Sequence, residues 1–222
     1  MTSAAYGAPR AARRISAPPP ASRSRTATTP QTSWPSARTA SIALTVEPPD
    51  VTTSSTIRQR SPCTSGAKAE YLVDAKRAIL RPAGFRALGE LVAGYARQWG
   101  ATAVGGLTMG ADAVACAALA GGADVKAFFV RKEAKRHGLA RRIEGPLLAA
   151  GDRCLVVEDV VSTGGSTVQA IEALQEAGHE ICGVVSVLDR LAGGGERIAA
   201  AAGAPYEPLT TIDDVYPDRP DR

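Results

Sequence analysis

The chain has 222 residues, an apolar content of 45% and a formal net charge of +4, which fit one folded domain with a tail. No apolar run approaches the roughly 18 residues of a membrane helix, and the N-terminus lacks a secretory apolar stretch, so neither a membrane protein nor a secreted one is expected. The four cysteines show no C-x-x-C spacing, which disfavours a zinc site and predicts reduced thiols in the cytoplasm.

The positive charge is confined to one end of the chain. Residues 1–63 contain eight arginines and two acids, a net charge of +6, whereas the remainder has 18 basic and 20 acidic residues, a net charge of −2. The predicted domain is therefore not basic, and binding to nucleic acid is not expected.

Residues 1–63 are dense in Ser, Thr, Ala and Arg and hold nine of the fifteen prolines. This composition predicts disorder, because it offers too little apolar surface to offset the ordering entropy. A transit peptide is a second interpretation. A third is a segment translated from a wrong reading frame or start site, since the composition changes abruptly near residue 64. We predict a folded domain over 64–214 and a tail over 215–222.

Apolar periodicity indicates alternating strands and helices from residue 64 onward. Strands are expected at 71–73, 102–104, 125–130, 154–157, 181–188 and 206–210. Helices are expected from Pro82 to Trp99, after a glycine turn at 105–110, at 167–177 and at 197–202, with a further helix start at Asp213–Asp214 and a turn at His179. The alternation predicts an α/β fold with a central, mainly parallel sheet and helices on both faces.

The most informative stretch is CLVVEDVVSTGGST, Cys154 to Thr167. An apolar strand runs into two acids, Glu158 and Asp159, and a small-residue loop then opens a helix. Such a loop offers N–H groups and hydroxyls to a phosphate, and the helix N-terminus adds positive potential. The carboxylates can accept hydrogen bonds from ribose hydroxyls. Alternatively, the acids form a solvated strand end and the loop is an ordinary turn with a serine N-cap.

Two more charged clusters follow predicted strands. Arg131–Lys132 comes after the strand at 125–130, and Asp189–Arg190 after the strand at 181–188. Parallel strands bring their carboxyl ends to one sheet edge, where ligands bind. The alternatives are a charged surface helix for the first cluster and a surface salt bridge for the second. Lys76 is expected to be a surface cation.

Four motifs in order resemble those of one family. The stretch at 154–167 resembles the phosphoribosyl pyrophosphate (PRPP) motif of type I phosphoribosyltransferases. RKEAKRHG, at 131–138, resembles the mobile catalytic loop of orotate phosphoribosyltransferases. TSGAKAEYLVD, from residue 64, resembles an early segment of that family, and VLDR, at 187–190, matches the strand end from which an Arg reaches orotate. The chain is therefore identified as a member of the orotate phosphoribosyltransferases.

The resemblance implies a Rossmann-like type I fold and the transfer of phosphoribose from PRPP to orotate, giving orotidine 5′-monophosphate and pyrophosphate in UMP synthesis. It implies Mg2+ held mainly by substrate oxygens, with no protein metal ligands, and a homodimer whose loop acts across the interface. The implied catalytic residues are Arg131, Lys132, Lys135 and His137. The implied PRPP site comprises those four and Glu158, Asp159, Val160, Val161, Ser162, Thr163, Gly164, Gly165 and Ser166. The implied orotate site comprises Ser162, Arg190, Lys68 and Tyr71.

The chain departs from the family pattern at three places. Met109 stands where many relatives have a Lys, and we expect it to pack rather than to bind. Thr64 stands where some members have a Lys that contacts orotate. Residues before Thr64 do not form the expected amphipathic helix, so the frame-error interpretation predicts that another frame of the coding DNA encodes one.

Two other functions remain open from the residues alone. A PRPP-binding regulator of transcription would keep the phosphate loop but lack RKEAKRHG and carry a DNA-binding segment. A transferase for a purine base would lack that loop and would have no use for an Arg at position 190. The presence of both features favours the orotate enzyme.

Overall fold

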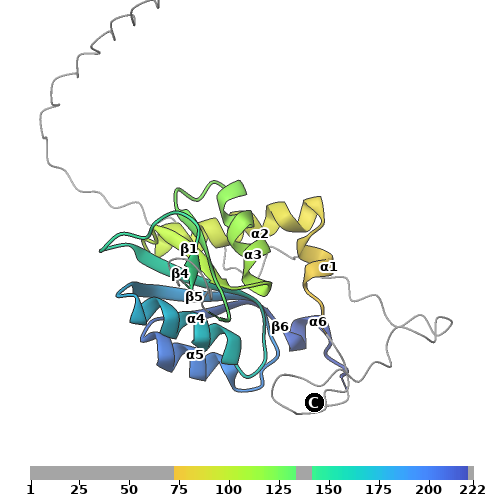
Figure 1. Cartoon of the computed structure of the whole chain (residues 1–222). Coiled ribbons are helices and arrows are strands. Elements are labelled where there is room, and N and C mark those ends of the chain that lie inside the picture. The colour runs from red at the N-terminus through yellow and green to blue at the C-terminus, as the bar shows by residue number, and fades with distance from the viewer. Residues whose placement is uncertain (1–72, 134–141, 220–222) are drawn as a thin grey trace, which may run out of the picture. The chain divides into compact units, whose positions relative to one another are not determined.

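We describe the protein from a computed structural model, which places residues 73–133 and 142–219. Figure 1 shows the elements. The helices are α1 (Lys76–Ile79), α2 (Pro82–Gln98), α3 (Gly110–Ala120), α4 (Gly165–Glu176), α5 (Gly194–Ala202) and α6 (Ile212–Val215). The strands are β1 (Ala103–Leu107), β2 (Lys126–Val130), β3 (Ile143–Glu144), β4 (Arg153–Val161), β5 (Glu180–Asp189) and β6 (Tyr206–Thr211).

The strands form one sheet in the order β3-β2-β1-β4-β5-β6. All pairs are parallel except β2 with β3, which is antiparallel. The predicted mainly parallel sheet is therefore confirmed. The chain order reverses direction across the β1–β4 pair, which is the place where open parallel sheets bind ligands at the carboxyl ends of their strands.

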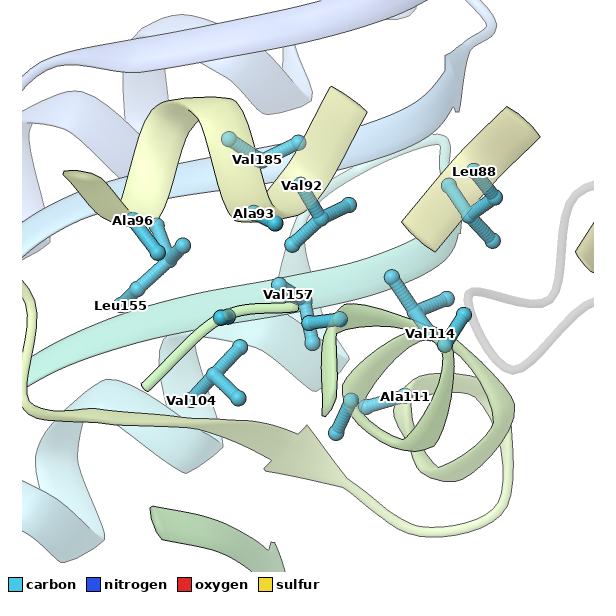
Figure 2. Packing of buried hydrophobic residues seen from close by; sticks show 14 of the residues in the cluster. Leu88, Val92, Ala93, Ala96, Val104, Ala111, Val114, Leu155, Val157 and Val185 are labelled. Atoms are coloured by element: carbon cyan, nitrogen blue, oxygen red, sulfur yellow. The ribbon is translucent and has the colours of Figure 1, made fainter. Parts of the chain in front are cut away.

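Helices cover both faces of the sheet, as predicted. On one face, Leu88 and Val92 of α2 and Val114 of α3 pack against Leu155 and other apolar residues of the strands (Figure 2). On the other face, α4 and α5 pack against the alternate strand residues. The two-sided burial explains why successive residues of β4 from Cys154 to Val157, and most of β5, are apolar rather than alternating with polar ones.

The predicted glycine turn at 105–110 is partly wrong, because Gly105 and Gly106 belong to β1. Both residues are buried. A Cβ on Gly105 would collide with the Phe128 backbone of β2, and one on Gly106 with the Val157 backbone of β4. These glycines let three strands approach closely, which local turn chemistry does not reveal.

The acids do not end their strand, which corrects the prediction of a strand over 154–157. Strand β4 continues through Glu158 and Asp159 to Val161, paired with β5 as far as Asp189. Helix α4 begins at Gly165, two residues earlier than predicted, after Gly164 adopts a left-handed φ of 73°. Helix α5 likewise begins at Gly194, earlier than predicted. The whole loop between β4 and α4 is therefore Ser162–Gly164.

The N-terminal border of the fold also differs from the prediction. The expected strand at 71–73 lies mostly outside the described residues, and Val73 is not in a strand. The short helix α1 follows instead, and Asp74 Oδ1 accepts a hydrogen bond of 3.3 Å from the Lys76 N–H. An aspartate side chain that bonds to the amide two residues later favours a turn over a strand. The expected start at Asp213–Asp214 is confirmed by α6, which has a capping box with Thr211.

One ion pair joins the amino ends of three strands. Lys126 of β2 lies 2.7 Å from Asp152 Oδ2. The same carboxylate accepts bonds from Thr102 Oγ1 at 2.8 Å and from the Ala149 N–H at 2.6 Å. These partners lower the pKa of Asp152 to about 2, the Lys126 bond most strongly. Over 73–133 and 142–219, no helix combines the length and apolarity needed to cross a membrane.

Candidate active site

Glu158 and Asp159 are buried side by side in β4. Their residues are 4% and 7% exposed, respectively, so neither is a solvated strand end. The Asp159 N–H donates to Glu158 Oε1 at 3.2 Å, and the Val160 N–H donates to Asp159 Oδ1 at 2.9 Å. A Cβ on Gly110, at the start of α3, would collide with both carboxylates. The site therefore needs glycine at that position to leave room for the acids.

The environment of Glu158 disfavours its charge. Burial, and then the neighbouring Asp159, raise the pKa of Glu158 well above its ordinary value. Thr167, buried in the first turn of α4, donates from Oγ1 to Glu158 Oε2 at 3.2 Å and partly opposes that rise. Buried acids with perturbed pKa values next to a cavity are characteristic of functional sites.

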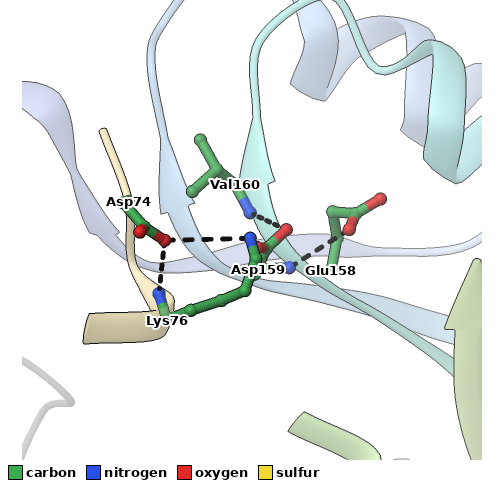
Figure 3. A network of polar contacts seen from close by, with 5 residues as sticks. All are labelled: Asp74, Lys76, Glu158, Asp159 and Val160. Atoms are coloured by element: carbon green, nitrogen blue, oxygen red, sulfur yellow. Dashed lines mark hydrogen bonds and ion pairs between the residues drawn. The ribbon is translucent and has the colours of Figure 1, made fainter. Parts of the chain in front are cut away.

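Lys76 joins this acid pair from α1. Its Nζ lies 2.6 Å from Asp159 Oδ2 and 3.9 Å from Asp74 Oδ1 (Figure 3). Burial lowers the pKa of Lys76. The hydrogen bond to Asp159 and the charge of that carboxylate together raise the pKa by more than burial lowers it, so the net shift is upward. Lys76 is half-exposed, as the prediction of a surface cation implies, but its ammonium is also bonded to the acid pair, which the prediction did not include.

A cavity of about 250 Å³ lies over these residues. Its lining comes from α1, the β1–α3 loop, the end of β2, β4 and the start of α4: Lys76, Leu107, Thr108, Met109, Gly110, Lys132, Glu158, Asp159, Val160 and Ser166. The Thr108–Met109 peptide bond in this loop is cis. The expectation that Met109 packs is wrong, because its side chain is 78% exposed. The cavity thus combines two acids, two lysines and two hydroxyl side chains.

The predicted phosphate loop lies at the N-terminus of α4. Ser162 is half-buried, Thr163 and Ser166 are exposed, and Gly164 is buried against the Gly194 backbone. The left-handed Gly164 turns the chain into the helix, so that free N–H groups of its first turn face outward from the helix end. Val161, by contrast, is 1% exposed and packs in the core. Its side chain therefore serves the fold rather than the cavity lining.

Arg190 lies beside that loop. Its N–H donates to the Val161 carbonyl at 2.8 Å, which ties the end of β5 to the end of β4. Asp189 is not a surface acid: it is 4% exposed, accepts from the Tyr206 hydroxyl at 2.8 Å and accepts from the Leu191 N–H at 2.8 Å. Burial is the main reason that the pKa of Tyr206 is raised. The Asp189 side chain thus holds the backbone just after Arg190 and is itself held by Tyr206.

Arg131 and Lys132 follow β2 directly, as predicted, and both are exposed. Lys132 lines the cavity with the acids, and both residues line a second cavity of about 500 Å³ together with Thr108 and Phe129. Arg131 Nη1 lies 3.6 Å from Glu144 Oε1 of β3. Lys135 and His137 lie outside the described residues, as do the orotate candidates Lys68 and Tyr71.

Sequence reasoning missed Lys76, Thr167 and Gly110. Thr167 stands nine residues after Glu158, at the start of a predicted helix, so its approach to the acid could have been anticipated. Lys76 and Gly110 carry no comparable signal, because their proximity to β4 arises from packing between distant segments.

Comparison with known proteins identifies the family of the chain. A family model described as the phosphoribosyl transferase domain matches residues 77–203. The orotate phosphoribosyltransferase of Corynebacterium glutamicum is 49% identical over 152 residues, spanning 68% of this chain and 82% of that protein. The chain belongs to the orotate phosphoribosyltransferase family. It is accordingly an enzyme of the pentosyltransferase class.

Solved structures agree with this assignment. The orotate phosphoribosyltransferase of Mycobacterium tuberculosis, in a complex with Fe(III) dicitrate, is 41% identical with a TM-score of 0.61 and covers 71% of this chain and 90% of its own. The same enzyme in a complex with PRPP is 40% identical with a TM-score of 0.58, covering 64% of this chain and 82% of its own. Their fold confirms the predicted type I phosphoribosyltransferase architecture of the orotate phosphoribosyltransferase family.

Proposed function

We propose that the residues around Glu158 and Asp159 carry out the family's reaction, which transfers the 5-phosphoribosyl group from PRPP to orotate. In this reaction the bond from ribose C1 to the pyrophosphate oxygen breaks, and a bond from C1 to a ring nitrogen of orotate forms. The observation that carries the proposal is the buried acid pair of β4 on the floor of a cavity whose rim is the start of α4.

The acid pair binds the ribose, and the loop after it binds the 5′-phosphate. Carboxylate oxygens accept hydrogen bonds from ribose hydroxyls. Ser162 to Ser166 offer hydroxyls and backbone N–H groups at a helix N-terminus, where an anion is stabilised. Both parts are joined through Thr167, which bonds to Glu158 from the first turn of the same helix. The phosphate and the ribose are therefore held in a defined register, which lowers the entropic cost of reaction.

The leaving pyrophosphate lies toward the side of the cavity at the end of β2. Lys132 lines that side, and Arg131 is adjacent to it. Lys135 and His137, on the segment that follows, complete the cationic set. Displacement at C1 builds negative charge on the pyrophosphate, and fixed cations stabilise this charge. A closing segment would also exclude water and thereby suppress hydrolysis of PRPP.

Mg2+ bound to PRPP would supply positive charge that neutralises the pyrophosphate. Over 73–133 and 142–219 no group of three or more His, Cys, Asp or Glu side chains is arranged to hold a metal ion. Mg2+ commonly keeps several waters and binds substrate phosphates through their oxygens. The chain's own contribution is then to orient the PRPP that carries the ion.

Orotate is recognised by Arg190. The guanidinium of Arg can pair with a carboxylate through two parallel hydrogen bonds, which Lys does not reproduce. The Asp189 side chain holds the backbone just after Arg190 by accepting from the Leu191 N–H, and Ser162, Lys68 and Tyr71 contribute further contacts. A base that carries a carboxylate is thereby preferred over a neutral one.

The proposed enzyme is a homodimer in the cytoplasm, in which Lys135 and His137 reach the partner's site. The cysteines in the described residues, Cys116, Cys154 and Cys182, are free thiols, which suits a reducing compartment. Sedimentation of the full chain tests the dimer. Mixing an Arg190→Ala chain with a Lys135→Ala chain should restore activity if sites are shared, because some mixed dimers then hold one intact site.

The direct test is the loss of orotate absorbance after PRPP and Mg2+ are added to the full chain. We expect turnover that depends on both additions. Lys135→Ala should reduce turnover strongly while leaving PRPP binding largely intact, because the residue acts on the leaving group. Unchanged turnover in this variant would refute the role of the loop, and absence of turnover in the wild-type chain would refute the proposed function.

A further inference from the structure

Lys76 has no part in the function proposed above, although it touches the centre of the site. Its ammonium bonds to Asp159 Oδ2 at 2.6 Å. The Lys76 side chain is 45% exposed, whereas that of Asp159 is 10% exposed. Both line the same cavity. The cation therefore reaches from the surface onto a carboxylate that would otherwise share a buried position with Glu158 without a charged partner of its own.

Two neighbouring buried acids are an unfavourable receptor for an anionic substrate. Like charges a few ångströms apart oppose joint ionisation, and burial strengthens the effect. PRPP adds further negative charge. A cation on one acid offsets this repulsion and keeps that acid able to accept hydrogen bonds.

The same contacts also fix the orientation of the Asp159 carboxylate. Asp159 is held from two sides, by the Val160 N–H on Oδ1 and by Lys76 on Oδ2. Each carboxylate oxygen can accept two hydrogen bonds, so each retains capacity for a ribose hydroxyl. A carboxylate fixed at both oxygens loses little rotamer freedom when ligand binds.

We propose that Lys76 is a positioning residue of the PRPP site, which holds Asp159 as a charged acceptor for the ribose hydroxyls. The inference rests on the proposed function for the identity of the ligand. Lys76 acts through Asp159 rather than on the reacting atoms, so its loss weakens PRPP recognition and leaves orotate recognition unchanged.

The proposal includes a dependence on pH. The charged groups around the Lys76 ammonium are Asp74 beside it, Asp159 and Glu158 on β4, and Lys132 on the same cavity. Without Lys76 the acid pair has lost its nearest cation, and Glu158, whose pKa is already raised by burial and by Asp159, retains its proton to higher pH. A protonated carboxyl is a poorer acceptor, so PRPP binding should then weaken as the pH falls and recover as it rises.

The experiment measures PRPP binding with Mg2+ by calorimetry, without orotate, on the full chain and on Lys76→Met. We expect about tenfold weaker binding near pH 7, since the pair is partly buried, with a larger loss at about pH 6 than at about pH 8.5. Lys76→Arg should restore affinity to within about twofold. Arg77→Met removes an exposed cation of the same helix and should match the wild type. The KM for orotate should stay unchanged in all variants.

Wild-type affinity of Lys76→Met over this pH range, or an equal loss in Arg77→Met, would overturn the inference. Thermal unfolding of each variant checks that it folds, and Lys76→Gln serves as a second neutral variant. If the wild type binds PRPP but consumes no orotate, the proposed function fails, and the binding data still decide the role of Lys76. If the wild type does not bind PRPP, both fail.

Discussion

Two lysine–aspartate pairs lie at opposite ends of the same sheet and have almost the same geometry. Lys126 and Asp152 are 2.7 Å apart, and Lys76 and Asp159 are 2.6 Å apart. In each pair the aspartate side chain is 10% exposed, and the lysine side chains are 45% and 37% exposed for Lys76 and Lys126, respectively. Distance and exposure alone therefore do not distinguish them.

Their surroundings do distinguish them. Asp152 lies at the amino ends of the strands and is saturated by Lys126, Thr102 and a backbone N–H, so its pKa falls to about 2. Asp159 lies near the carboxyl ends, next to Glu158, whose pKa is raised by burial and by Asp159. The first pair stabilises the fold, whereas the second lies beside another buried acid at the cavity where the ligand is proposed to bind. This contrast, rather than the ion pair itself, marks the functional end of the sheet.

The strongest test of the contrast replaces the aspartate of each lysine–aspartate pair by asparagine. Asp159→Asn should lower kcat/KM for PRPP by about a hundredfold, since the charged carboxylate that accepts hydrogen bonds from the ribose hydroxyls is lost. Asp152→Asn should leave kcat/KM unchanged. Steady-state kinetics of both variants provide the check, and a comparable loss in the two would mean that the acid pair of β4 has no special place in binding.

A smaller effect is expected from crowding the acid pair. Gly110→Ala adds a methyl group that would collide with both carboxylates. The acids must then shift, and PRPP affinity should fall by about tenfold. Gly94→Ala in α2 is the matched control, because a Cβ there meets no atom within 4 Å; it should add up to about 1 kcal/mol of stability without changing affinity. Wild-type PRPP affinity in Gly110→Ala would contradict the close packing.

The Lys126–Asp152 pair should contribute measurably to the free energy of unfolding. Asp152→Asn should lower the free energy of unfolding by about 1 kcal/mol at neutral pH. The folded pKa of Asp152, about 2, lies below its ordinary value of 3.8, so its contribution is complete above the unfolded pKa and lost as the pH falls from about 4 to about 2. Denaturant unfolding at several pH values tests this: a stability difference that persists below about pH 2 would assign the effect to packing instead.

The smallest effect concerns the hydrogen bond that links the acids to α4. Thr167→Val removes the donor to Glu158 but keeps the shape of the side chain. Because that bond opposes the upward shift in the pKa of Glu158, its loss should weaken PRPP binding about two- to threefold near neutral pH. Binding measured at higher pH should recover. A loss that is independent of pH would indicate an effect on the position of α4.

Much of this site could be predicted from local sequence. The order of apolar strands and helices leads to a parallel sheet, and the strand ends then bring Arg131–Lys132, the acid pair and Arg190 to one edge. The stretch from Cys154 to Thr167 could be interpreted as a phosphate loop because its strand, acids, small residues and helix are contiguous. Burial of Val161 and the exposure of Met109 were not anticipated, because both depend on which face packs against the neighbouring elements.

The sequence by itself determined the alternation of strands and helices and the residues of the β4–α4 motif, since both follow from periodicity and short-range chemistry. Only the tertiary structure decided that β4 runs on through its acids, that Gly105, Gly106 and Gly110 admit neighbouring strands and carboxylates, and that Lys76 reaches Asp159. The physical reason is distance along the chain: Lys76 and Asp159 are separated by 83 residues. A contact of that kind is selected by the packing of whole elements and leaves no local pattern.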